Sequence, residues 1–105
     1  MKTNNFQEFM KIATLDQMTV LSKVIEVFDD EFFYKKIEDI DFRVDDLGKR
    51  AYDVRVYSVT GDLVARVDLQ DFEYLHYPDR MHVHFTKKLD DLNLMLTKMI
   101  KKYGK

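Results

Sequence analysis

His82 and His84 are the residues of this sequence best suited to bind a metal ion. On a β-strand, residues two apart point to the same face, so the two imidazoles would lie side by side. If the chain forms a hairpin around residues 77–80, Glu73 lies opposite His84 and completes a set of two histidines and one carboxylate. His-x-His is common by chance, and these residues fall on the solvent face of that hairpin. We therefore expect an exposed histidine pair, with no metal and no cofactor.

Groups for covalent or acid–base catalysis are scarce. With no Cys, the chain lacks a thiolate nucleophile, disulfides and sulfur-based zinc sites. Ser22 falls within a helical pattern and Ser58 on the apolar side of a strand, so neither sits on a tight turn that would expose a nucleophile. The adjacent acids Asp45 and Asp46 point apart, and three scattered Gly residues cannot form a phosphate-binding loop. The sequence predicts that the protein is not an enzyme.

The segment from residue 26 to residue 46 is strongly acidic, with nine acids and three bases, a balance of −6. It contains three consecutive aromatic residues, which cannot all face inward, and exposed aromatics are frequent hot spots of interfaces. An acidic rim around an aromatic anchor suits a basic protein partner. We therefore predict a small regulator, inhibitor or adaptor that acts by protein–protein contact. The expected partner-binding residues are Asp29, Asp30, Glu31, Phe32, Phe33 and Tyr34.

Nucleic-acid binding is the alternative function. Arginine and tyrosine side chains on a sheet face can stack exposed bases, and lysines can follow a phosphate backbone. The candidates are Arg55, Tyr57 and Arg66 on the outer sheet face, and Lys98, Lys101 and Lys102 in the C-terminal helix. Residues 87–105 hold six Lys and two Asp, a balance of +4. However, Asp53 and Asp68 share the sheet face with the arginines, and the net charge of −2 gives no overall attraction to RNA or DNA.

The bulk properties suit one domain spanning residues 1–105, because three Gly and one Pro leave no room for a linker. The longest apolar runs have three residues, far short of the roughly 20 that cross a membrane, and the N-terminus shows no signal-peptide pattern. We expect a cytoplasmic protein without membrane contact, either a monomer or a homodimer. The usage of Lys, Asn, Asp and Phe is reminiscent of plasmid or phage proteins from AT-rich bacterial genomes.

Two amphipathic helices are predicted in the N-terminal third. Residues 5–12 form a short one, where Asn5 and Glu8 could make a capping box. A second box, formed by Thr14 and Gln17, begins a stronger helix. Its apolar stripe consists of Leu15, Met18, Leu21, Val24, Ile25 and Phe28. Residues 31–40 mix helical and strand periods, and we lean towards a helical turn or two there.

From Ile40 the apolar period changes to two, which predicts a short edge strand through Val44. A hairpin follows in residues 51–69. Its apolar faces are Tyr52, Val54, Val56 and Ser58 on the first strand, and Leu63, Ala65, Val67 and Leu69 on the second. A further hairpin pairs residues 72–76 with 81–85, and a helix closes the chain from about residue 88 to 103.

The first hairpin has two possible registers. One places Arg55 opposite Arg66, and it also places Asp53 opposite Asp68. The other begins its loop with Gly61, as a type II′ turn requires, and pairs Arg55 with Asp68. Cross-strand pairs contribute roughly 0.2–1 kcal/mol each, so the like-charge pairs of the first register favour the second.

The fold class predicted from these elements is α+β. We expect an antiparallel sheet of four to five strands, with the N-terminal helices and the C-terminal helix packed on one face. The buried stripe of the last helix is Leu89, Leu92, Leu96, Met99, Ile100 and Tyr103.

Overall fold

The sheet has four antiparallel strands in the order β1-β2-β3-β4, a simple meander, in the computed structural model, which describes residues 5–81 and 86–103. The strands are β1 (Asp41–Val44), β2 (Arg50–Tyr57), β3 (Leu63–Asp68) and β4 (Tyr74–His76). The helices are α1 (Asn5–Ile12), α2 (Leu15–Val27) and α3 (Thr86–Tyr103), with a short 3₁₀ helix, η1 (Pro78–Arg80), after β4. The predicted α+β class is confirmed, as is the position of β1 at a sheet edge.

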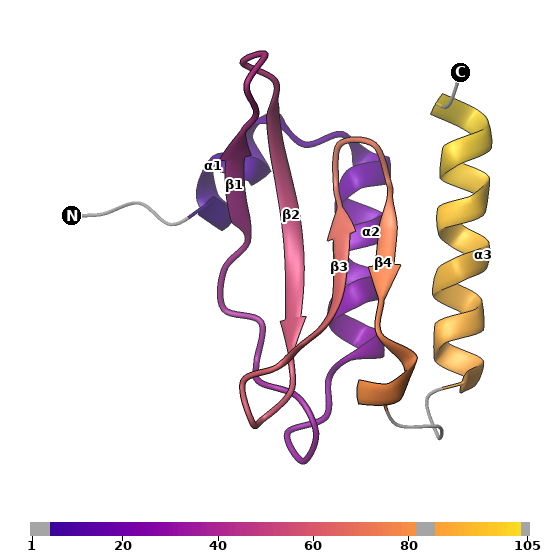
Figure 1. Ribbon diagram of the computed structural model, residues 1–105. Helices are drawn as coiled ribbons and strands as arrows, with labels where there is room; N and C mark the ends of the chain where they lie inside the picture. Colours follow the sequence, from indigo (N-terminus) through magenta and orange to yellow (C-terminus); the bar gives the residue numbers. More distant parts are fainter. Residues whose placement is uncertain (1–4, 82–85, 104–105) are drawn as a thin grey trace.

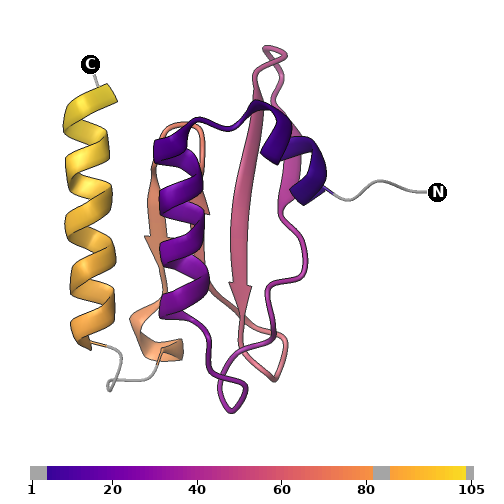
Figure 2. The ribbon, with the colours of Figure 1, turned by 180° about the vertical axis from the view of Figure 1, so that it is seen from behind.

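Helices α1 and α2 lie over one face of the sheet, and α3 runs alongside α2 in the opposite direction (Figures 1 and 2). The faces predicted for the first hairpin are confirmed except near its loop, because Tyr52, Val54, Val56, Ala65, Val67 and Leu69 join one buried cluster with α2. Near the loop, Ser58 and Leu63 are half-buried and Val64 is buried instead. The fully buried members from β2, β3 and α2 include Val54, Val56, Ala65, Val67, Val20, Val24 and Val27. Each such valine contributes roughly 1.5–3 kcal/mol by leaving water. No helix among the described residues is long and apolar enough to cross a membrane.

The two N-terminal helices begin differently. At α2 the capping box forms as predicted, since the Gln17 amide donates to Thr14 Oγ1 at 3.2 Å and the Thr14 amide donates to Gln17 Oε1 at 2.9 Å. Asn5, by contrast, is already inside α1, and its side-chain amide donates to the Ile40 carbonyl at 2.7 Å. The Phe6 amide donates to Asp39 Oδ1. The start of α1 is therefore fixed to the chain that enters β1.

The buried face of α2 is rotated relative to the predicted stripe. Leu15 is 82% exposed and Ile25 38% exposed, whereas Val20 and Val27 are fully buried. The stripe was inferred from the spacing of apolar residues alone, whereas in the fold α2 packs against α3 as well as the sheet. Val20 and Val27 belong to the same buried cluster as Leu92 and Leu96 of α3.

Residues 31–40 are not helical beyond a single turn. The Tyr34 amide donates to the Asp30 carbonyl at 2.9 Å, which closes that turn. The chain then runs extended beside the end of β2, where Tyr34 forms a bridge with Ser58 and the Lys35 amide donates to the Tyr57 carbonyl at 2.9 Å. The free backbone groups at this end of β2 therefore decide the conformation that the mixed pattern left open.

The predicted register of the β2–β3 hairpin is wrong. Arg55 lies opposite Arg66 and Asp53 opposite Asp68, the arrangement that the like charges argued against. The strands shift register between Val56 and Tyr57, so that Tyr57 faces Leu63 rather than Arg66. The loop is closed by the Ser58 amide, which donates to the Asp62 carbonyl at 2.8 Å, and Gly61 adopts a positive φ of 97° within it.

The second predicted hairpin is described only in part. The turn at residues 77–80 is present as η1, but β4 pairs with β3, with Tyr74 opposite Val67. The expected partner strand at 81–85 falls mainly on residues 82–85, outside the described part of the chain, and Met81 is extended. Helix α3 begins two residues earlier than predicted and ends as predicted. Leu92 and Leu96 are buried, whereas Ile100 and Tyr103 are about half exposed.

Candidate functional site

The acidic aromatic segment, residues 29–34, holds its three aromatic side chains in different environments. Phe32 is 87% exposed, Phe33 is half-buried and Tyr34 is 2% exposed. Tyr34 packs edge-on against Phe28, with ring centroids 5.2 Å apart, while the Phe32 amide donates to Asp30 Oδ1 at 2.9 Å. The buried Tyr34 thus fixes the turn, and the turn presents Phe32 to solvent. Of the predicted anchors, Phe32 is accessible and Tyr34 belongs to the core.

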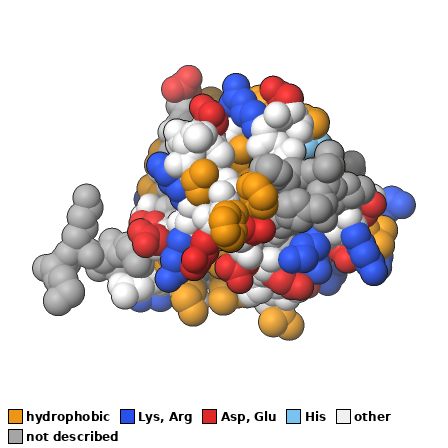
Figure 3. All heavy atoms as spheres, turned by 90° about the horizontal axis from the view of Figure 1, so that it is seen from below, with side chains coloured by type: hydrophobic (Ala, Val, Ile, Leu, Met, Phe, Trp, Pro, Cys, Tyr) orange, Lys and Arg blue, Asp and Glu red, His pale blue; other side chains and the backbone are white. Residues whose placement is uncertain are grey.

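The acids of this segment line a hollow at the end of α2. The hollow has a volume of about 330 Å³. Its apolar wall is formed by Ile25, Phe28 and Ile37 and its acidic rim by Asp29, Asp30 and Glu31; Lys36 also lines it. Figure 3, which views the molecule from this end, shows hydrophobic side chains near the middle of the face with charged side chains around them. Carboxylates and the negative end of the α2 dipole lie together here, which favours a positively charged group.

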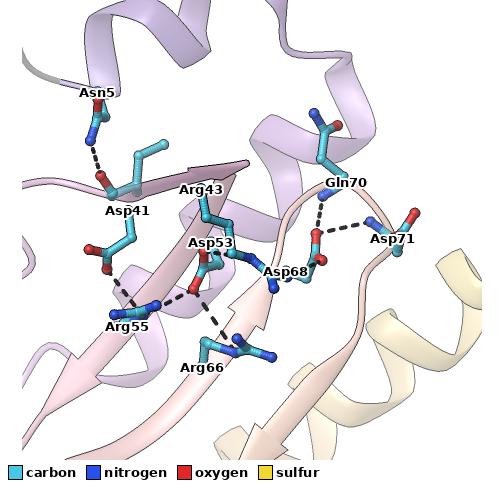
Figure 4. Close-up of polar contacts among 10 residues, drawn as sticks. Asn5, Asp41, Arg43, Asp53, Arg55, Arg66, Asp68, Gln70 and Asp71 are labelled. Carbon is cyan, nitrogen blue, oxygen red and sulfur yellow. Dashed lines mark hydrogen bonds and ion pairs between the residues drawn. The ribbon is translucent and has the colours of Figure 1, made fainter. Parts of the chain in front are cut away.

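The uncovered face of the sheet carries a different arrangement, the sheet-face cluster. Its members are Asp41, Arg43, Asp53, Arg55, Arg66 and Asp68 (Figure 4). Asp53 is fully buried at its centre, with Arg55 Nε 3.2 Å and Arg66 Nε 4.0 Å from Oδ2. Arg43 Nε lies 3.5 Å from Asp53 Oδ1 as an ion pair without a hydrogen bond.

The same cluster explains how the like-charge register is tolerated. Arg43 comes from β1 and reaches both aspartates, since its Nη2 donates to Asp68 Oδ2 at 3.0 Å. Asp68 is also bound by the Gln70 amide at 2.7 Å and the Asp71 amide at 3.1 Å. Asp53 is therefore neutralised by Arg55 of its own strand, Arg66 of β3 and Arg43 of β1, and Asp68 by Arg43 and two backbone amides, although the residue directly opposite each aspartate is the other aspartate. Opposed pairs alone predicted the wrong register because they omit these contacts.

Two of the residues predicted to bind nucleic acid, Arg55 and Arg66, belong to this cluster. Their side chains are 34% and 27% exposed, and both guanidinium groups lie against Asp53. Tyr57 is half-buried at the end of β2. The structure brings these three residues onto one face, yet it engages both arginines in ion pairs that a phosphate group would have to break.

The C-terminal lysines Lys98, Lys101 and Lys102 are all exposed, but they differ in whether they pair with an acid of the fold. Lys102 Nζ lies 2.9 Å from Asp16 Oδ2, and the Tyr103 hydroxyl donates to the same carboxylate. These contacts hold the pKa of Asp16 below its ordinary value, the Tyr103 hydrogen bond most and Lys102 next. Lys98 and Lys101 are exposed. Asp16 therefore ties the start of α2 to the end of α3.

Of the three metal candidates, the structure describes Glu73 alone. Glu73 is exposed after β3, but His82 and His84 fall outside the described residues. Within residues 5–81 and 86–103, no three His, Asp or Glu side chains lie together closely enough to hold a metal ion.

A groove on the outer side of the helices is the feature that the sequence did not reveal. Two adjoining hollows of about 500 Å³ and 330 Å³ lie along α2 and α3 and share Lys23 and Met95 as lining residues. Leu15 and Leu94 are 82% and 57% exposed there. The available signal was Leu94, an apolar residue outside the buried stripe of α3. An exposed apolar residue of this kind lines a groove only when another helix lies beside its own, and the sequence alone does not place α2 beside α3.

Comparison of the chain with protein-family models, with curated proteins and with solved structures finds no match.

Proposed function

We propose that this protein is a small regulator, inhibitor or adaptor without enzymatic activity, which binds a protein partner through the acidic aromatic segment. The proposal rests mainly on Phe32, a phenylalanine that is 87% exposed although its neighbour Tyr34 is buried. Burying a Phe side chain is favourable by roughly 1.5–3 kcal/mol, which is available to a partner rather than to the fold. Anchors of this kind dominate the energy of many interfaces.

The chemistry around Phe32 suggests which partner would bind. Asp29 and Glu31 are exposed on either side of the turn, and the neighbouring hollow joins an apolar wall to an acidic rim. An arginine or lysine side chain fits such a surface, because its aliphatic stem can cover apolar atoms while its charge meets the carboxylates. A basic protein, such as one whose own site binds nucleic acid, is the partner class that this surface favours.

The decisive experiment compares capture by wild-type protein, Phe32→Ala and Leu47→Ala from an extract of the native host. Leu47 is a matched control, since it is 94% exposed in the turn between β1 and β2, at the opposite end of the molecule. We expect one basic protein to be lost with Phe32→Ala and retained with Leu47→Ala. Both substitutions should change the free energy of unfolding by no more than about 0.5 kcal/mol, as exposed sites do. Equal capture by all three proteins would contradict the proposal.

The alternative, a small RNA- or DNA-binding regulator, receives less support from these contacts. It would rely on Lys98 and Lys101, because Arg55 and Arg66 are paired with Asp53. The same preparations distinguish the two functions. Nucleic acid that co-purifies with wild-type protein, and is released between about 50 and 200 mM salt, would favour the alternative.

A further inference from the structure

The two oppositely charged parts of the chain lie at opposite ends of its helix pair. The lysines near the end of α3 lie beside the start of α2, as the contact between Lys102 and Asp16 shows. The acidic aromatic segment follows the other end of α2 (Figure 1). Thirteen helical residues separate the two by about 20 Å, so the basic and acidic ends do not meet within one molecule.

The groove between α2 and α3 offers an apolar surface of the kind against which a helix packs. Its two hollows extend from Leu15 and Ser22 on α2 to Leu94, Met95 and Met99 on α3. Methionine side chains adapt to the shape of an incoming helix, and partly exposed leucines gain by being covered. The groove flanks are charged, with Lys23 and Glu26 on α2 and Asp91 and Lys98 on α3.

The outer stripe of α3 is complementary to itself. Asp91, Leu94, Met95 and Lys98 follow the spacing of one helix face. When two such helices pack antiparallel about a point between Leu94 and Met95, each Asp91 lies level with the Lys98 of the other copy. Both residues are about 5 Å from that point along the helix axis. The apolar pair then lies at the centre, between two opposite-charge pairs.

We propose that the occupant of this groove is a second copy of the chain, with its α3 antiparallel to the first α3 about a two-fold axis near Leu94 and Met95. The resulting contact is isologous, because each α3 enters the groove of the other molecule. The antiparallel arrangement also carries the lysines of one α3 toward the α2 end of its partner that bears Glu26 and Asp29. A homodimer therefore brings together the two charge excesses that a single molecule keeps apart.

The primary test is the molar mass of the full chain in solution, measured by light scattering over a wide range of concentration. We expect a mass of twice 12.6 kDa at high concentration, dissociating on dilution and in high salt. Leu94→Asp should give a monomer at the concentrations where wild type is dimeric. Leu47→Asp, an equally drastic change in the turn between β1 and β2, away from α3 (Figure 1), should leave the dimer intact. Circular dichroism should show native helix content for both variants.

A charge exchange tests the register itself. Asp91→Lys alone places like charges level with each other and should raise the dimer dissociation constant about ten-fold or more. The double variant Asp91→Lys with Lys98→Asp restores opposite charges and should recover the wild-type constant. A monomer at every concentration, or a dimer insensitive to Leu94→Asp, would overturn the proposal, as would a double variant no tighter than the single one. Phe32→Ala should leave the mass unchanged, so this inference and the proposed function can fail separately.

Discussion

The sheet-face cluster and the acidic aromatic segment both concentrate acidic residues but bury them to different degrees. In the cluster, a fully buried aspartate is surrounded by three guanidinium groups, and most of the charge is neutralised within the fold. In the segment, Asp29 and Glu31 are exposed and flank an exposed Phe32. Charge density alone would nominate both regions as binding surfaces. Burial and partners distinguish a surface that stabilises the fold from one that can meet another molecule.

The contrast in burial is sharpest within the acidic aromatic segment, where Phe32 is exposed and Tyr34, two positions later, is buried. Tyr34→Ala should lower the free energy of unfolding by roughly 3–5 kcal/mol, because it removes a buried ring packed on Phe28. Urea unfolding measures this directly, with Phe32→Ala as the exposed neighbour that should change little. Similar losses for the two variants would mean that Phe32 also packs into the core.

The cluster predicts a smaller but substantial effect. Asp53→Asn should cost about 3 kcal/mol of unfolding free energy, near the lower end for a broken buried pair, because the three arginines are partly exposed and water can reach them. Asp46→Asn, in the exposed turn after β1, is the control and should change stability by less than about 0.5 kcal/mol. If both variants unfold at the same urea concentration, the buried Asp53 carboxylate contributes no more to stability than the exposed Asp46 carboxylate.

The smallest effect is expected for the surface contact of Asp16 with Lys102 and Tyr103. The lowered pKa of Asp16 means that the contact stabilises the fold above the ordinary value of 3.8 and that this contribution is lost as pH falls through the folded value. The raised pKa values of Tyr103 and Lys102 set the opposite limit. Their contributions are present below the ordinary values of 10.0 for Tyr103 and 10.5 for Lys102, and are lost as pH rises through the folded pKa values.

Thermal unfolding of wild type and Asp16→Asn across pH checks this window. The two proteins should differ modestly near neutral pH, where the exposed pair is screened by salt, and should converge in strong acid. A difference that persists unchanged in strong acid would show that Asp16 acts through its shape and not its charge.

Local patterns determined most elements of this protein and the inner face of the β2–β3 hairpin. The period of two in residues 52–56 and 63–69 predicts the strands and the residues that line the core, and the Thr14–Gln17 box predicts the start of α2. These predictions succeed because side-chain direction along a strand and the capping of a helix depend only on nearby residues.

Tertiary structure alone decided the register, the choice among the three aromatics and the groove. Arg43, from a third strand, makes the like-charge register of β2 and β3 acceptable. The end of β2 draws Tyr34 inward and leaves Phe32 outside. The partner of each charge or ring lies far away in sequence, and its contribution exists only once the chain has brought the two together.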